Sequence, residues 1–287
     1  MKRQENFYPG TFFRKGGGSM VRRMMIWCFV LSGIMATMPG RALSADAITT
    51  GPKQYWQKAT EYADNKLYVD AVEYYTRAIR TNKGEIPMED VARIFISRGM
   101  AFLGLNEQDR AIDDFSNALE LDDKNQEAAL SRGNVYLNRK QYARAQDDFS
   151  MVIKLNPRST AAYAGRSRAF QEAGDHDRAI ADLTKLLELE PKNVGALYSM
   201  GMSYKAKHQD EKALEAFDRA LKIDSNHAAA SYQKAGIYAR TKKIDSACVW
   251  LDIAVADGYR DWDALRNNPD FDSLRKVDCY RKTMAGK

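Results

Sequence analysis

Small, aromatic and apolar positions recur along this chain with a period of 34 residues. Each copy has a small residue, an aromatic three positions later, an alanine nine positions further on and an apolar residue four positions after that. The copies are Gly99/Phe102/Ala111/Phe115, Gly133/Tyr136/Ala145/Phe149, Ser167/Phe170/Ala179/Leu183 and Gly201/Tyr204/Ala213/Phe217. Such a period predicts a solenoid, in which each unit buries its apolar face only against its neighbours.

The apolar spacing inside each copy is that of α-helices. Ala213, Phe217 and Leu221 follow one another at intervals of four, which places them on one face of a helix. Pro157 and Pro191 each end a second helix, because proline supplies no amide hydrogen and its ring clashes with the preceding turn. The sequence therefore predicts two antiparallel helices per unit and an all-α fold.

These positions resemble the tetratricopeptide repeat family, whose 34-residue pattern favours a small residue at position 8, an aromatic at 11, Ala at 20 and Pro at 32. Four copies in phase begin at residues 92, 126, 160 and 194. The resemblance implies a right-handed superhelical solenoid of about six helix-turn-helix units with a C-terminal capping segment. The expected units are 52–91 (degenerate, with an insertion), 92–125, 126–159, 160–193, 194–227 and 228–257 (degenerate), followed by a cap over 258–287.

The segment after residue 257 departs from the repeat and is similar to the caps that often follow such arrays. Asp261 and Asn268 are placed as N-caps of two short helices. We expect the apolar residues of this segment to cover the open face of the last unit; they are Trp262, Leu265, Phe271 and Leu274. The alternative is that Trp262 and Phe271 form an exposed site for a partner.

The N-terminal residues 1–45 have the order of a secretory signal peptide. Arg22 and Arg23 precede the apolar run 24–38, and small residues then allow cleavage between Ser44 and Ala47. An uncleaved anchor is the alternative, but the run is shorter than the ~20 residues that span a bilayer. Met1 and Met20 are alternative translation starts. We therefore expect a periplasmic or secreted protein, with no stable membrane span after cleavage.

The positive charge of the chain also lies in this N-terminal segment. The formal net charge is +6, and residues 1–45 contain seven basic residues and one acidic residue, so the remainder is balanced. Without a basic excess the mature chain lacks the phosphate neutralisation that dominates nucleic-acid affinity. Nucleic acid is therefore not an expected partner.

Charges at positions 7 and 23 of the repeat change together. Three units have Arg and Asp there, whereas the unit that begins at 194 has Met200 and Ala216. This covariation predicts ion pairs between the two helices of one unit: Arg98 with Asp114, Arg132 with Asp148, and Arg166 with Asp182. The alternative is solvated charges that match by coincidence, and exposed pairs would contribute only about 0–1 kcal/mol each.

Two cysteines, Cys248 and Cys279, remain after the proposed cleavage. An even pair in an oxidising compartment favours a disulfide, which would attach the C-terminal segment to the last repeat. Two separate thiols are the alternative, since the sequence does not show whether the Cα atoms come within about 7 Å.

Candidate catalytic residues are scattered over different units. His176, His208 and His227 fall in turns, and the chain has no HExxH, GxSxG, Walker-type glycine loop or CxxC motif. The pairs Asp113-Asp114 and Asp147-Asp148 each contain one aspartate already assigned to an arginine. We therefore expect a noncatalytic protein without metal or cofactor.

The resemblance also implies a binding surface. In the family, ligand contacts come mostly from positions 2, 5, 9, 12 and 13 of the first helix of each unit, which line a concave groove. Carried over to this chain, the candidates are Trp56, Ile96, Met100, Leu103, Leu130, Asn134, Leu137, Arg168, Tyr198, Met202, Lys205 and Tyr232. The lysine and asparagine that some members use to hold a chaperone C-terminus are not both present, because Ile96 and Leu130 occupy the lysine position.

This largely apolar groove favours an amphipathic helix or an extended peptide as its occupant. The expected function is a protein-interaction scaffold or adaptor in the bacterial cell envelope. The alternative is an assembly or secretion accessory that acts through homo-oligomerisation of the solenoid.

Overall fold

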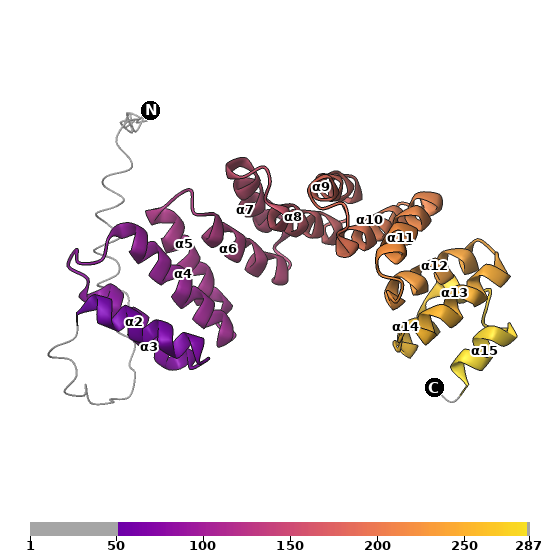
Figure 1. The fold of residues 1–287 in the computed structure, drawn as a ribbon, viewed down its shortest axis with the longest axis horizontal. Coiled ribbons are helices and arrows are strands. Elements are labelled where there is room, and N and C mark those ends of the chain that lie inside the picture. Colours follow the sequence, from indigo (N-terminus) through magenta and orange to yellow (C-terminus); the bar gives the residue numbers. More distant parts are fainter. Residues whose placement is uncertain (1–50, 286–287) are drawn as a thin grey trace, which may run out of the picture. The chain divides into compact units, whose positions relative to one another are not determined.

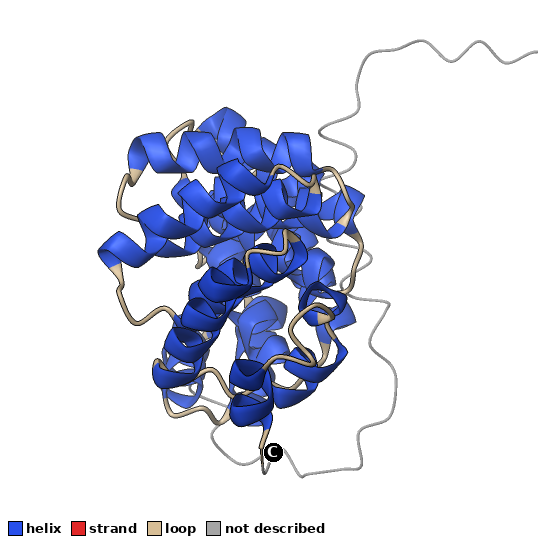
Figure 2. Ribbon diagram, turned by 90° about the vertical axis from the view of Figure 1, so that its right-hand side faces the viewer, coloured by secondary structure: helices blue, strands red, loops and turns tan. Residues whose placement is uncertain are grey.

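The computed structural model describes residues 51–285, and within them it contains helices and loops but no strand (Figures 1 and 2). The predicted all-α fold is confirmed. The helices are α2 (Pro52–Asp64), α3 (Tyr68–Thr81), α4 (Met88–Gly104), α5 (Gln108–Leu121), α6 (Gln126–Asn138), α7 (Tyr142–Leu155), α8 (Thr160–Glu172), α9 (His176–Leu189), α10 (Val194–Ala206), α11 (Asp210–Ile223), α12 (Ala228–Arg240), α13 (Ile244–Ala256), α14 (Trp262–Asn267), the 3-10 helix η2 (Pro269–Phe271) and α15 (Asp278–Met284).

The helices belong to two compact units, one that ends at Asp123 and one that begins at Lys124. In the N-terminal unit α2 pairs with α3, α4 pairs with α5, and α3 packs against α4. The C-terminal unit contains the hairpins α6/α7, α8/α9, α10/α11 and α12/α13, each packed on the next. No helix within residues 51–285 is both long enough and apolar enough to cross a membrane. The predicted signal peptide and its cleavage point lie outside the described residues.

Small residues permit the close approach of the two helices in a hairpin. Phe217 of α11 is fully buried, and a Cβ atom added to Gly201 of α10 would lie 2.5 Å from its ring. The same relation holds between Phe149 and Gly133, at 3.0 Å. Glycine at this position therefore makes room for the aromatic ring of the second helix.

The turn inside each hairpin ends the first helix with a residue in the left-handed conformation. These residues are Lys66, Asn106, Lys140, Gly174, His208 and Lys242, with φ between 55° and 82°. A left-handed residue lets the following amides bond back to the last carbonyls of the helix. Gln209, for example, donates its backbone N–H to the carbonyl of Tyr204 at 2.9 Å.

Three arginine–aspartate pairs connect the two helices of single hairpins. Each arginine donates through Nε and Nη2 to both carboxylate oxygens; the distances are 2.8 and 2.7 Å for Arg98–Asp114, 2.9 and 2.7 Å for Arg132–Asp148, and 2.8 and 2.7 Å for Arg166–Asp182. The aspartate side chains are only 3–7% exposed. These pairs are therefore buried, in contrast to the exposed pairs considered in the sequence analysis.

The pKa values in these pairs follow from burial and hydrogen bonding. The hydrogen bonds to Asp148 and Asp182 raise the pKa of Arg132 and of Arg166. Burial raises the pKa of Asp114, although Arg98 opposes this. The shift of the Asp114 pKa therefore follows from burial, whereas the shifts of the two arginine pKa values follow from hydrogen bonding to the charged form.

The C-terminal segment covers the last hairpin. Leu265, Phe271 and Leu274 are fully buried against α12 and α13, so Phe271 is not part of an exposed partner site. Asp261 and Asn268 accept hydrogen bonds from backbone amides two or three residues later, at 2.8 and 3.0 Å. Trp262 is partly buried against the same cluster.

A disulfide joins this segment to the last repeat. Cys248 of α13 and Cys279 of α15 are bonded, with their Cα atoms 5.8 Å apart. The bond spans 31 residues and encloses α14 and η2.

Candidate functional site

Three of the predicted groove residues are buried and do not line a binding surface. Ile96 is 3% exposed, and Leu137 is 6% exposed among the core residues of the hairpin α6/α7. Tyr232 is also 6% exposed, because its ring stacks on Tyr259 at 4.2 Å and its hydroxyl accepts a hydrogen bond from Asn268. For these three positions the prediction is wrong, since neighbouring helices and the C-terminal segment cover the side chains.

Lys205 has partners within the chain. Its Nζ lies 2.8 Å from a carboxylate oxygen of Asp270 and donates to Gln233 at 2.7 Å. The side chain is 16% exposed. Lys205 therefore holds the C-terminal segment against α10 and does not present a free charge to a partner.

Three other candidates lie together in one groove of the C-terminal unit. Arg168 of α8 and Tyr198 and Met202 of α10 line a cavity of about 690 Å³, which we call the α8–α10 groove. Residues that line it are Ala164, Ser167, Arg168, Gln171, Glu172, His176, Leu183, Leu186, Asn193, Gly195, Ala196, Tyr198, Ser199, Met202 and Ala206. The positions that the resemblance selects on two successive first helices thus converge on one groove.

Small residues keep this groove open. Ala164 is exposed on α8, and Gly195 has no atom nearer than 3.5 Å to the place where a Cβ would be. Larger side chains at either position would project into the space. The volume lies within the range of about 300–1,000 Å³ that is usual for ligand pockets.

The polar groups of the groove differ in their partners. Gln171 donates to the carbonyl of Ser199 at 2.8 Å and to the hydroxyl of Ser203 at 2.7 Å, which ties α8 to α10. Arg168 is exposed and makes no hydrogen bond or ion pair within residues 51–285. The Nδ1 atom of His176 is buried without a partner in the same part of the chain. Arg168 is therefore available to an acceptor group of a ligand.

Tyr198 has a fixed orientation in the groove. Its ring stacks on the imidazole of His227 at 5.1 Å and lies 5.7 Å from the ring of Phe217. Its remaining exposed surface faces the cavity together with Met202. The aromatic surface is thus held in place before any ligand binds.

The remaining candidates lie outside this groove. Met100 is 51% exposed on α4, and Leu103 is half-buried on the same helix. Leu130 is half-buried and Asn134 is exposed, both on α6. Leu130 packs against the core of the hairpin α6/α7, and none of the four residues lines the α8–α10 groove.

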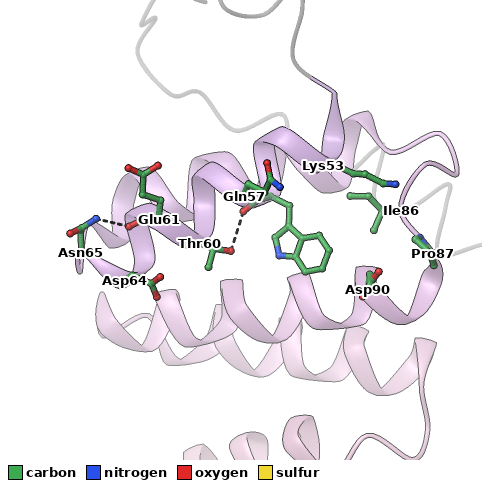
Figure 3. Close-up of a pocket in the computed structure, with 10 residues that line it drawn as sticks. Lys53, Gln57, Thr60, Glu61, Asp64, Asn65, Ile86, Pro87 and Asp90 are labelled. Carbon is green, nitrogen blue, oxygen red and sulfur yellow. Dashed lines mark hydrogen bonds between the residues drawn. The ribbon is translucent and has the colours of Figure 1, made fainter.

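The N-terminal unit has a groove of its own, about 710 Å³ in volume, between α2 and the start of α4 (Figure 3). Trp56 is the predicted residue that lines it. The full lining of this N-terminal groove is Lys53, Trp56, Gln57, Thr60, Glu61, Asp64, Asn65, Ile86, Pro87 and Asp90. Ile86 and Pro87 were missed because they belong to the insertion that interrupts the period.

Within residues 51–285, no group of three or more His, Cys, Asp or Glu side chains could hold a metal ion. His176, His208 and His227 lie in or beside separate turns.

Comparison with known proteins agrees with the geometry. The tetratricopeptide repeat profile matches residues 96–160, 130–194, 165–228 and 198–264, together more than half of the chain. The structure is similar to YrrB, described as a tetratricopeptide protein with an unusual peptide-binding site, with 26% identity, a TM-score of 0.56 and coverage of 68% of this chain and 97% of that one.

MamA structures are also similar in fold. One MamA structure has 20% identity, a TM-score of 0.56 and coverage of 62% of this chain and 94% of that one. MamA from Desulfovibrio magneticus RS-1, from residue 41 to its end, has the same identity and TM-score, with coverage of 61% and 96%. No curated protein matches the sequence. Because the repeat profile covers more than half of the sequence and the helices follow its period, the chain belongs to the tetratricopeptide repeat family.

Proposed function

We propose that this protein is a noncatalytic scaffold that binds a peptide segment of a partner protein in the α8–α10 groove, in the bacterial cell envelope. The observation that carries the proposal is the convergence of Arg168, Tyr198 and Met202 on one open groove. Tetratricopeptide proteins are typically noncatalytic interaction scaffolds, and the similarity to YrrB, a tetratricopeptide protein with an unusual peptide-binding site, supports the same role here.

The groove suits an extended segment with one acidic side chain. Small residues on both helices leave space for the peptide backbone, and Tyr198 and Met202 offer apolar surface to its side chains. Arg168 would pair with a carboxylate or a backbone carbonyl, since a guanidinium presents several donors in a fixed plane. Because Tyr198 is already held by His227 and Phe217, little ordering entropy is lost on binding.

The proposed location rests on two features. Residues 1–45 have the order of a signal peptide, and the disulfide between Cys248 and Cys279 is typical of an oxidising compartment. The alternative role through end-to-end assembly has less support, because Leu265, Phe271 and Leu274 already cover the face of the last hairpin.

A groove-filling substitution tests the proposal. Ala164→Trp places an indole in the α8–α10 groove at an exposed position, so the fold is retained. Chemical crosslinking in the cell envelope followed by affinity purification would then compare the partners recovered with the wild-type protein and with the variant. We expect the principal partner to be lost.

The matched control is Ala181→Trp, which adds the same side chain at an exposed position of α9 outside the groove. This control is expected to retain the partner. Equal recovery with Ala164→Trp and with the control would refute the groove as the binding site.

A further inference from the structure

The insertion at residues 82–87 is an ordered loop built around a buried asparagine. Asn82 is 6% exposed; its Oδ1 accepts from the backbone amides of Gly84 and Ile86 at 3.2 and 2.9 Å. Its Nδ2 donates to the carbonyl of Ile86 at 3.0 Å, and Ile86 itself is 2% exposed. Insertions in repeat arrays lie on one face, which is often the binding face. This loop places Ile86 and Pro87 as one wall of the N-terminal groove.

The opposite wall of the groove is an aromatic and acidic face of α2. Trp56, Thr60 and Asp64 follow one another at intervals of four and therefore lie on one face. The chain's own Arg93, whose side chain is 69% exposed, has its guanidinium carbon 5.9 Å from the centroid of the Trp56 ring. The Trp56 ring is only half-buried and lines the groove, so it offers aromatic surface to a partner side chain beside this contact.

Charge is unevenly distributed along the groove. Glu61 and Asp64 lie at one end of α2, and Lys53 lies at the other end near Ile86 and Pro87 (Figure 3). The carboxylates of Glu61 and Asp64 are exposed and make no hydrogen bond or ion pair within residues 51–285. Among the lining residues Asp90 pairs with Arg93 at 3.3 Å, which leaves the two carboxylates of Glu61 and Asp64 against the single ammonium of Lys53. The end of the groove at Glu61 and Asp64 is therefore complementary to a cation.

We infer that the N-terminal groove is a second docking site, for an extended partner segment in which an apolar residue precedes two basic residues. The apolar side chain packs on Trp56 beside the wall formed by Pro87, and the basic side chains reach Glu61 and Asp64. This site is independent of the α8–α10 groove, because it lies in the other unit and selects the opposite charge.

Two labelled peptides test the inference on the full chain. Both have a Gly/Ser backbone, and their centres are Leu-Lys-Lys in one and Leu-Glu-Glu in the other; binding is measured by fluorescence anisotropy. We expect the lysine peptide to bind and the glutamate peptide not to bind. The variant Glu61→Lys/Asp64→Lys should lower the affinity for the lysine peptide by about tenfold or more, because it replaces two charge attractions by two repulsions.

The matched control has the same change in charge outside the groove. Asp113→Lys/Glu120→Lys alters two exposed positions of α5 and should leave the affinity within about twofold, because distant exposed charges are screened. Ala164→Trp should also leave the affinity for the lysine peptide unchanged, because Ala164 lies in the other groove. The two experiments therefore test this inference and the proposed function independently. Trp56→Ala is expected to lower the affinity as well, and the charge reversal keeps the test valid if Trp56→Ala loses helicity.

Several outcomes would overturn the inference. They are equal binding of the two peptides, an affinity that the Glu61/Asp64 reversal leaves unchanged, and absence of binding to the wild-type chain. Binding that appears only after removal of residues 1–45 would instead make this chain's own basic segment the occupant. A dimer in light scattering that the reversal dissociates would make a second copy the occupant.

Discussion

The buried pair Arg166–Asp182 allows a sharp test of how this array is stabilised. Arg166→Met removes the two hydrogen bonds to Asp182, of 2.8 and 2.7 Å, and a third to the hydroxyl of Ser150 at 2.9 Å. It leaves the carboxylate of Asp182 in a site where its side chain is 7% exposed. At the equivalent positions the next unit has Met200 and Ala216, which are 7% and 3% exposed. The fold therefore accepts an apolar pair in the same place.

The expected magnitudes differ between the single and double variants. Removing one partner of a buried pair costs about 3–5 kcal/mol, because the other charge is left without compensation. Arg166 is 21% exposed, so water reaches part of the site and the lower end of that range, about 3 kcal/mol, is expected. The double variant Arg166→Met/Asp182→Ala should lie within about 1 kcal/mol of the wild type, because well-packed apolar residues often replace such pairs without loss.

Urea unfolding followed by far-ultraviolet circular dichroism would measure these differences, with Asp182→Ala completing the double-mutant cycle. We expect a coupling free energy of about 5 kcal/mol between the two side chains, because each single variant should cost about 3 kcal/mol and the double variant about 1 kcal/mol or less. A single Arg166→Met variant that costs less than about 1 kcal/mol would refute the reasoning. So would a double variant that is as unstable as the single one.

Three further predictions concern the C-terminal unit. Burial raises the pKa of Tyr259 above the value of about 10 that a tyrosine has in the unfolded chain. The hydroxyl therefore loses its proton at a higher pH in the folded state, and the unfolding free energy should fall as the pH rises above about 10. Thermal melts of Tyr259→Phe should show a shallower fall, and an unchanged slope would contradict this. Replacing Cys248 and Cys279 by Ala should lower the unfolding free energy by about 3–4 kcal/mol, as the loop-closure entropy of the 31-residue span predicts; the check is calorimetry with and without reductant. Gly201→Ala should destabilise by about 1–3 kcal/mol because its methyl would lie 2.5 Å from a ring carbon of α11, whereas Gly195→Ala, with nothing nearer than 3.5 Å, should be neutral or stabilising in the same melts.

The fold was predictable because the repeat makes strict demands at particular positions. Gly201 and Ala213 have to be small for α10 and α11 to approach, so their recurrence identifies the hairpin. The arginine–aspartate pairs could be predicted for a similar reason, since both positions change together, to Met200 and Ala216, in the unit that lacks the pair. The burial of the pairs could not be predicted, because the sequence does not show how far a charged side chain lies from solvent.

The binding surface was predictable only in part. Arg168, Tyr198 and Met202 occupy family positions that remain open to the α8–α10 groove after the neighbouring helices have packed. Tyr232 occupies a corresponding position, but the C-terminal segment covers it, and no repeat pattern describes that segment. The wall at Pro87 was missed because the period stops where the insertion begins.

The disulfide between α13 and α15 determines the order in which the hairpins of the C-terminal unit unfold. A linear array holds each hairpin only through its neighbours, so it erodes from whichever end is least secured. Because the disulfide crosslinks its last elements, we expect heat, mechanical force or a protease to unfold first the hairpins of this unit that have no crosslink, and α12 and α13 last. Limited digestion should therefore leave shortened fragments that share a common carboxyl-terminal piece.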